Sequence, residues 1–232
     1  MILLTVRSYF HVEEQDMTSE YGDQKLGYLR KEGMSYCLSL HGYGPKRYKR
    51  IAGFFSETRG YFLDVGCNHG ELKEFLKPGL RYFGVDFRGN VFKDFVLADL
   101  NRTSLPFKDK SFDAINCSAV MEHLFYPLDL LREIKRVLKD DGTALISLPN
   151  DRGLNSRYYY VFGKIDDFDD SVFGHHWRFS INTARSFVEK EFQIIEEWAE
   201  FGPIFLTYLF FLKFKSLSTE WFMLCKKRLG RK

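Results

Sequence analysis

The chain has 232 residues, which fits one domain with a small appended cap, and its 45% hydrophobic residues are enough to fill a large core. The net charge of +3 is too small to argue for a nucleic-acid-binding protein. Cys37, Cys67, Cys117 and Cys225 form no CxxC pair, and Arg7 interrupts the first apolar run, which argues against a disulfide framework and a secretory leader. We therefore expect a cytoplasmic protein with reduced thiols.

The N-terminal part of the chain precedes any regular pattern. Residues 1–40 show no sustained hydrophobic period, and we expect an irregular or helical cap there. In residues 45–55, apolar side chains recur at helical spacing among basic ones, which predicts an amphipathic helix. The predicted N-terminal cap and helix together span residues 1–57, and a larger domain spans residues 58–232.

Strands and helices are predicted to alternate after this helix. Short apolar runs indicate strands over 61–65, 81–85, 95–98, 112–117 and 143–148, and helical spacing indicates helices over 71–76 and 128–138, with a stop at Asp140, Asp141 and Gly142. After residue 149 the pattern loosens, with a predicted helix over 181–189 and strands over 192–198 and 220–225. This alternation predicts an α/β fold whose parallel sheet is covered by helices on both faces.

A glycine-containing turn, LDVGCNHG at residues 63–70, follows the first predicted strand. Doubly wound sheets bind nucleotide-like ligands at such a turn, because glycine permits positive φ and a close approach to the backbone. The dinucleotide fingerprint GxGxxG needs glycines where Asn68 and Glu71 stand, and no GK[ST] follows for a P-loop. The turn therefore favours a cofactor that carries no phosphate.

Acidic residues end three successive predicted strands. Asp64 suits an ammonium group through a charge-assisted hydrogen bond or a water, and Asp86 suits the two hydroxyls of a ribose. Asp99 suits an adenine amino group, with Phe87 and Leu100 on either side of the ring. Each acid alone is equally explained by a local turn. Their conjunction favours S-adenosylmethionine, which combines an amino acid end, a sulfonium and an adenosine.

Several ordered motifs make the sequence similar to the class I S-adenosylmethionine-dependent methyltransferases, the type 11 group in particular. They are LDVGCNHG, YFGVD, AD followed by LPFKDKSFDAI, SAVMEHL and LREIKRVLKDDGTALISLPN, all within residues 61–150, and then HHWRFS at 175–180. The resemblance implies a Rossmann-like, doubly wound sheet of seven strands, with helices on both faces and the last strand antiparallel. It implies that S-adenosylmethionine is bound by Asp64, Gly66, Gly70, Asp86 and Asp99, with Ser118 and residues 121–123 at the methyl end. Their neighbours Cys67, Asn68, Phe87 and Leu100 complete the predicted cofactor-binding set.

The sequence departs from the family pattern at two places. Asn68 stands where the middle glycine of the turn is usual, and asparagine tolerates left-handed φ better than most residues. The usual Pro-Gly-Gly before the fifth strand is Asp140-Asp141-Gly142, which we interpret as a surface turn. Neither change alters the predicted cofactor.

Three histidines are candidate catalytic residues. His123 follows the fourth predicted strand, and His175 and His176 lie in a later loop that can fold over the same opening. An oxygen acceptor of high pKa needs a general base, and histidine is the commonest one. The alternative for each is a structural or surface histidine. Glu122 is a candidate base, metal ligand or capping residue, but no second ligand stands at a suitable spacing, so we predict no metal site.

The acceptor is expected to be set by the cap and by substrate-side insertions at about 150–180 and 202–217. Aromatic residues at 155–162 and the apolar run at 203–214 indicate a small molecule or a glycan- or lipid-linked precursor, although both segments can equally pack against the domain. The ten residues 203–212, the most apolar part of this run, are too few to span a bilayer. Together with the basic C-terminus they predict at most peripheral contact with the inner face of a membrane.

Two other functions remain open from the sequence. RNA methylation is supported only by the basic tail and by the positive charge of the predicted helix at Lys46, Arg47, Lys49 and Arg50. A cofactor-binding scaffold without turnover would keep the same cofactor residues. We predict an O-methyltransferase in preference to both.

Overall fold

The structure is a computed structural model that describes residues 45–87, 92–102, 104–153, 156–157, 175–200 and 218–228. Of the predicted cap over 1–57, only the part from residue 45 lies within these ranges. The insertion predicted at 202–217 and most of the one at 150–180 lie outside them, so both stay predictions. Among the described residues, no helix combines the length and the apolar character needed to cross a membrane.

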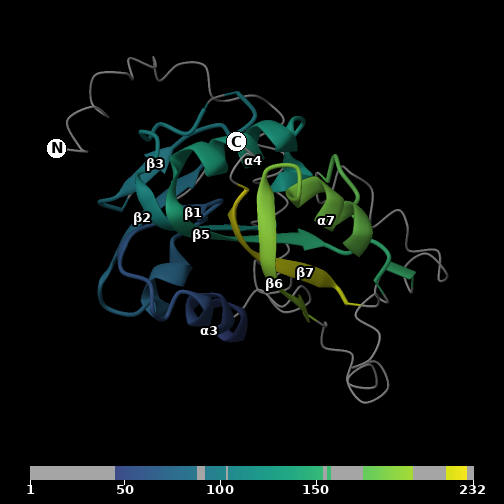
Figure 1. The fold of residues 1–232 in the computed structure, drawn as a ribbon, viewed down its shortest axis with the longest axis horizontal. Helices are drawn as coiled ribbons and strands as arrows, with labels where there is room; N and C mark the ends of the chain where they lie inside the picture. Colours follow the sequence, from purple (N-terminus) through teal and green to yellow (C-terminus); the bar gives the residue numbers. More distant parts are fainter. Residues whose placement is uncertain are drawn as a thin grey trace, which may run out of the picture. The chain divides into compact units, whose positions relative to one another are not determined.

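Seven strands form one sheet in the order β3-β2-β1-β4-β5-β7-β6 (Figure 1). Strands β1 to β5 pair in parallel, and β7 runs antiparallel to both of its neighbours. The bounds are β1 Gly60–Val65, β2 Leu80–Asp86, β3 Phe95–Leu97, β4 Phe112–Ser118, β5 Leu138–Pro149, β6 Phe192–Glu200 and β7 Glu220–Lys227. The predicted seven-stranded, doubly wound fold is confirmed. The strand order reverses between β1 and β4, the position at which such sheets bind ligands.

Helices cover both faces of the sheet, as the alternation predicts (Figure 1). They are α3 Pro45–Phe54, α4 Pro127–Val137 and α7 Ile181–Val188, with the short 3-10 helices η1 Glu71–Phe75 and η2 Met121–His123. Ile51 of α3 shares one core cluster with Phe62 of β1, whereas Ile134 of α4 and Val188 of α7 share a second cluster with Leu63. Phe62 and Leu63 enter different clusters because successive strand side chains point to opposite faces.

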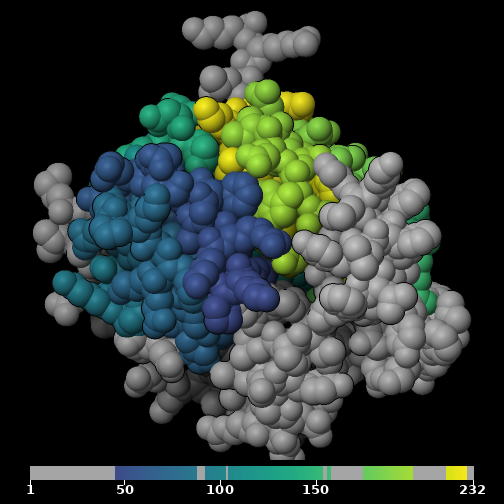
Figure 2. All heavy atoms as spheres, turned by 90° about the horizontal axis from the view of Figure 1, so that it is seen from below, coloured from purple at the N-terminus to yellow at the C-terminus, as the bar shows by residue number. Residues whose placement is uncertain are grey.

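Helix α3 belongs to the sheet domain and lies beside β6 on the face drawn in Figure 2, where the purple-blue of α3 adjoins the lime green of β6. The ring of Phe54 stacks on Trp198 with centroids 3.8 Å apart, and Trp198 stacks in turn on Phe222 of β7. The predicted amphipathic helix is therefore present, and its apolar side covers the antiparallel part of the sheet.

The start of β5 differs from the prediction. The strand begins at Leu138, directly after α4, and the segment expected to be a turn lies within it. Pairing with β4 jumps from Phe112 opposite Leu138 to Ala114 opposite Thr143, so the extra residues form an irregularity of the strand rather than a connection. Asp140 in this irregularity is exposed and pairs with the ammonium of Lys110 at 2.6 Å.

Candidate active site

The turn after β1 adopts the backbone conformation that its sequence requires. Gly66, Asn68 and Gly70 have φ of 74°, 49° and 81°, so the asparagine takes the left-handed conformation usually given to glycine. The amides of Gly66 and Cys67 both donate to the carbonyl of Val85, at 2.8 and 3.2 Å. These two bonds hold the turn against the end of β2.

Gly66 also brings the turn close to the segment that follows β4. A Cβ atom at this position would lie 2.3 Å from Cγ2 of Val120, well inside van der Waals contact. Val120 directly precedes η2. The turn expected to hold the cofactor and the segment expected at the methyl end are therefore in direct contact.

Asp64 is buried and linked to both neighbouring strands. Tyr82 Oη and Asn116 Nδ2 donate to its two carboxylate oxygens, at 2.8 and 2.7 Å. Burial raises the pKa of Asp64 to about 6, although both of these hydrogen bonds oppose the shift. Ser118 Oγ extends the network by donating to Asn116 Oδ1 at 2.7 Å. Asp64 thus fixes the strand ends around the turn.

Asp86 connects the end of β2 to the same turn. Its Oδ2 accepts a hydrogen bond from the amide of Asn68 at 2.9 Å. A carboxylate offers about four acceptor positions, so this bond is compatible with ribose hydroxyls on the same group. Phe87, the next residue, has 52% of its surface exposed.

Asp99 and Leu100 follow β3 at the same edge of the sheet. The amide of Asn101 donates to Asp99 Oδ1 at 2.9 Å, and Arg102 Nε lies 3.4 Å from its other oxygen. These are local turn contacts, which agree with the alternative in which Asp99 only stabilises a turn. Leu100 packs partly against the core. Asp99 remains the least strongly supported of the three acids.

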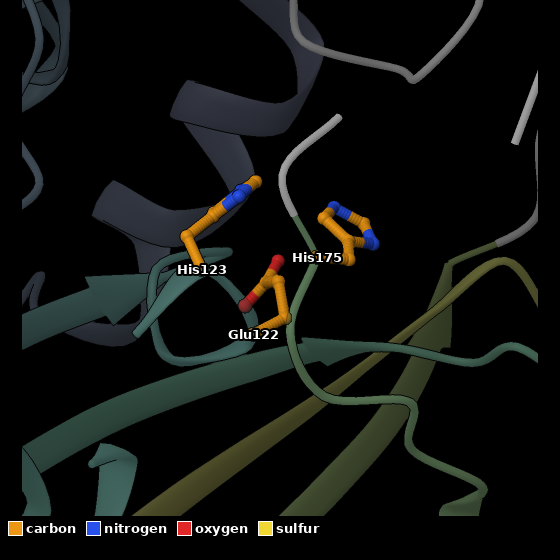
Figure 3. Close-up of side chains that lie close together, drawn as sticks. All are labelled: Glu122, His123 and His175. Carbon is orange, nitrogen blue, oxygen red and sulfur yellow. The ribbon is translucent and has the colours of Figure 1, made fainter. Parts of the chain in front are cut away.

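Glu122, His123 and His175 come together above the end of β4 (Figure 3). One potential metal-ligating atom from each lies within 4.8 Å of the other two, and the imidazole centroids are 4.6 Å apart with a 73° angle between the rings. Glu122 is 1% exposed, and burial raises its pKa to about 8. Its Oε2 has no hydrogen-bond partner within the part of the chain that the structure describes.

Backbone hydrogen bonds hold the loop that carries His175 in this position. The amides of His176 and Trp177 both donate to the carbonyl of Glu122, at 2.7 and 3.2 Å. The ring of His176 is exposed and stacks on Phe125 with centroids 4.2 Å apart, outside the cluster. Of the three predicted histidines, the structure therefore brings His123 and His175 together and leaves His176 at the surface.

Sequence analysis missed the partners of Asp64. Tyr82 and Asn116 lie inside strands whose apolar character dominated the interpretation. The available signal was the polar side chain of Asn116, which is 4% exposed, within the otherwise apolar and fully buried stretch 114–117 of β4. Such a side chain needs a hydrogen-bonding partner.

Comparisons with known proteins agree with this architecture. Residues 63–146 match the family described as a methyltransferase domain. An uncharacterized protein of Methanocaldococcus jannaschii is 36% identical over 92 residues, which cover 38% of this chain and 40% of that protein. The ubiquinone biosynthesis O-methyltransferase of Xanthomonas campestris pv. campestris is 27% identical over 124 residues, which cover 48% of this chain and 52% of that enzyme. The crystal structure of a methyltransferase dependent on S-adenosylmethionine from Archaeoglobus fulgidus matches with a TM-score of 0.56 and 19% identity, over 87% of this chain and 98% of the other.

Residues 63–146 match a methyltransferase domain, and the strand order and the turn after β1 agree with the fold of class I S-adenosylmethionine-dependent methyltransferases. This family and fold imply S-adenosylmethionine as the cofactor. The turn fits it, because Glu71 beside the turn is compatible with a ligand that has no phosphate. The chain spans about half the length of the curated relatives it matches, 40% and 52% for the two above.

Proposed function

We propose that this protein transfers the methyl group of S-adenosylmethionine to a hydroxyl oxygen of a small molecule or of a glycan- or lipid-linked precursor. The observation that carries the proposal is the cluster of Glu122, His123 and His175 next to the cofactor turn. An acceptor hydroxyl must lose its proton on transfer, and an imidazole at this position can accept it. The printed name of the Xanthomonas relative, an O-methyltransferase, also favours an oxygen acceptor.

Separate residues of the chain bind the cofactor and accept the proton of the acceptor. S-adenosylmethionine, when bound, supplies an electrophilic methyl group on a positively charged sulfur. Asp86 and the turn hold the adenosine so that the methyl group faces η2, and fixed orientation is a large part of the rate enhancement in such a displacement. His123 and His175 face the acceptor and take up its proton as the oxygen–carbon bond forms and the carbon–sulfur bond breaks.

Aromatic side chains support an acceptor with a flat or apolar body. Phe125, Tyr126 and Trp177 are exposed by 57%, 68% and 46%, and the indole of Trp177 donates to the carbonyl of Phe125 at 3.4 Å. Exposed aromatic surface next to a reactive cluster is suited to stacking on a ring or a sugar. The aromatic residues predicted at 158–162 and the apolar run at 203–214 lie outside the described residues.

The charges on α3 count against RNA as the acceptor. Arg47 is 4% exposed and pairs with Glu220, and Arg50 pairs with Glu200. Two of the four cations that supported RNA are thus engaged with carboxylates. In the basic tail, Lys227 pairs with Asp140 at 3.1 Å. Peripheral membrane contact through 203–214 and the last residues stays a proposal.

The transfer is tested by incubating the purified full chain with S-adenosylmethionine labelled in its methyl group and an extract separated into small-molecule, lipid, glycan and RNA fractions. We expect label in a small-molecule, lipid or glycan product, with fragmentation locating the methyl group on oxygen. Label confined to RNA, or to nitrogen atoms, would contradict the proposal. Tight cofactor binding without any product across all fractions would instead support a scaffold.

Replacing Asp86 by alanine tests how the cofactor is held. The variant loses one or two hydrogen bonds to a charged group, so the dissociation constant for S-adenosylhomocysteine should rise by roughly tenfold or more. Isothermal titration calorimetry measures it. Asp99→Ala is the comparison, and the local contacts of Asp99 predict a smaller rise. An unchanged dissociation constant in a folded Asp86→Ala protein would mean that another group holds the ribose.

A further inference from the structure

The donor set of the cluster is that of a metal site. Two imidazole nitrogens and one carboxylate oxygen, one from each of Glu122, His123 and His175, lie within 4.8 Å of one another. The His₂–carboxylate set occurs in catalytic zinc sites and in other sites for first-row divalent metals, and three protein ligands leave room for a substrate oxygen. The sequence predicted no metal because the second histidine comes from a loop far along the chain.

One residue of this cluster carries a buried oxygen that has no hydrogen-bond partner among the described residues. Glu122 Oε2 is buried and accepts no hydrogen bond from the described residues, which is rare for a carboxylate in a protein interior. Figure 3 shows the carboxylate of Glu122 directed between the two imidazoles. A bound cation would satisfy this oxygen and would compensate the cost of burying the carboxylate.

The separations are close to those of an occupied site. With metal–ligand bonds of about 2.1 Å, two ligand atoms lie roughly 3.4 Å apart at a tetrahedral ion and about 4.2 Å apart at most. Ligand atoms up to 4.8 Å apart therefore need to close by up to about 1.4 Å to reach the tetrahedral separation. Rotation of the side chains can supply this, because the main chain of the loop is already held by two hydrogen bonds to the Glu122 carbonyl.

We propose that Glu122, His123 and His175 bind one divalent first-row transition metal ion, such as Zn²⁺, and that this ion binds the acceptor hydroxyl. The inference about its role rests on the proposed function, whereas binding of the metal does not. A hydroxyl bound to such an ion has a lowered pKa and releases its proton to solvent. The resulting oxygen then forms its bond to the methyl carbon as the carbon–sulfur bond breaks. The imidazoles act in this case as ligands rather than as the base.

Metal binding is tested without cofactor or acceptor. The full chain, purified without a polyhistidine tag and stripped with a chelator, is titrated with Co²⁺ followed by visible absorption and with Zn²⁺ followed by calorimetry. We expect one ion per chain. The affinity should fall about a hundredfold or more in His175→Ala and in Glu122→Gln, since even outer-shell changes cost ten- to hundredfold. His176→Ala is the matched control and should bind as the unchanged protein does, because its ring stacks on Phe125.

The outcomes separate this inference from the proposed function. No metal binding, or equal affinity in His175→Ala and His176→Ala, overturns the metal site. Methyl transfer to oxygen that persists at full rate in chelator overturns the role of the ion but leaves the proposed function standing. One bound ion in a protein that methylates no oxygen supports the site and contradicts the proposed function. Circular dichroism of each variant checks that a lost affinity does not reflect a lost fold.

Discussion

Replacing Glu220 by alanine should lower the free energy of unfolding by about 3–5 kcal/mol, because it leaves the guanidinium of Arg47 buried without its counter-charge. The two side chains are 4% and 9% exposed, with Arg47 Nη2 2.6 Å from Glu220 Oε1. Ser147 also donates to this carboxylate, and the guanidinium lies over the ring of Phe222 at 5.3 Å. The group therefore joins α3 to β5 and β7 in the interior.

Chemical denaturation followed by circular dichroism measures this loss. Arg50→Ala is the control, since Arg50 is 49% exposed in its pair with Glu200 and its loss should cost less than about 1 kcal/mol. Exchanging Arg47 and Glu220 together for methionine and leucine should recover most of the stability, because no buried charge is then left unpaired. Equal losses for Glu220→Ala and Arg50→Ala would contradict a buried ion pair. If Glu220→Ala fails to fold, Glu220→Gln provides the same comparison with a smaller loss in the free energy of unfolding.

The second large effect is on catalysis. Changing His123 to alanine should lower kcat for methyl transfer by about 10²–10⁴, the usual contribution of a positioned acid–base group. The same direction is expected if His123 holds a metal ion, since the acceptor oxygen would then lose its Lewis acid. The dissociation constant for S-adenosylhomocysteine should change little, because the proposed adenosine site is formed by the turn and β2 rather than by η2. Steady-state kinetics with saturating cofactor measures the loss.

His176→Ala gives the control for this prediction. Its ring is exposed and stacks on Phe125, so kcat should stay within about twofold of the unchanged protein unless the loop itself moves. A His123→Ala protein that keeps full activity would remove the cluster from the mechanism. A loss that appears only in KM for the acceptor would give His123 a binding role in place of a chemical one.

Local sequence was sufficient where one short segment decides the structure. The strands around the turn alternate strongly enough with helices for their positions and direction to be predicted. The left-handed conformation of Asn68 follows from the known tolerance of asparagine, and φ of 49° agrees with it. The start of β5 was misjudged, because Asp140 and Gly142 are typical turn residues although here they lie in an irregular part of a strand.

Sequence was insufficient where the structure depends on segments far apart in the chain. His175 reaches Glu122 through backbone hydrogen bonds from its own loop, and no spacing rule connects the two positions. The contacts of Asp64 with Tyr82 and Asn116 likewise depend on the parallel register of three strands. Without these contacts, Asp64 is assigned to the ligand alone, whereas the structure gives it a role in holding the strand ends.

The central claim is that the turn after β1, together with the carboxylate of Asp86, binds the adenosine of S-adenosylmethionine. Calorimetric titration of the folded protein with this cofactor and with S-adenosylhomocysteine tests it most directly. The account predicts one saturable site per chain for both compounds. If folded protein releases or takes up no heat with either compound at several temperatures, and equilibrium dialysis also finds no binding, the assignment of the turn and of every residue around it is contradicted.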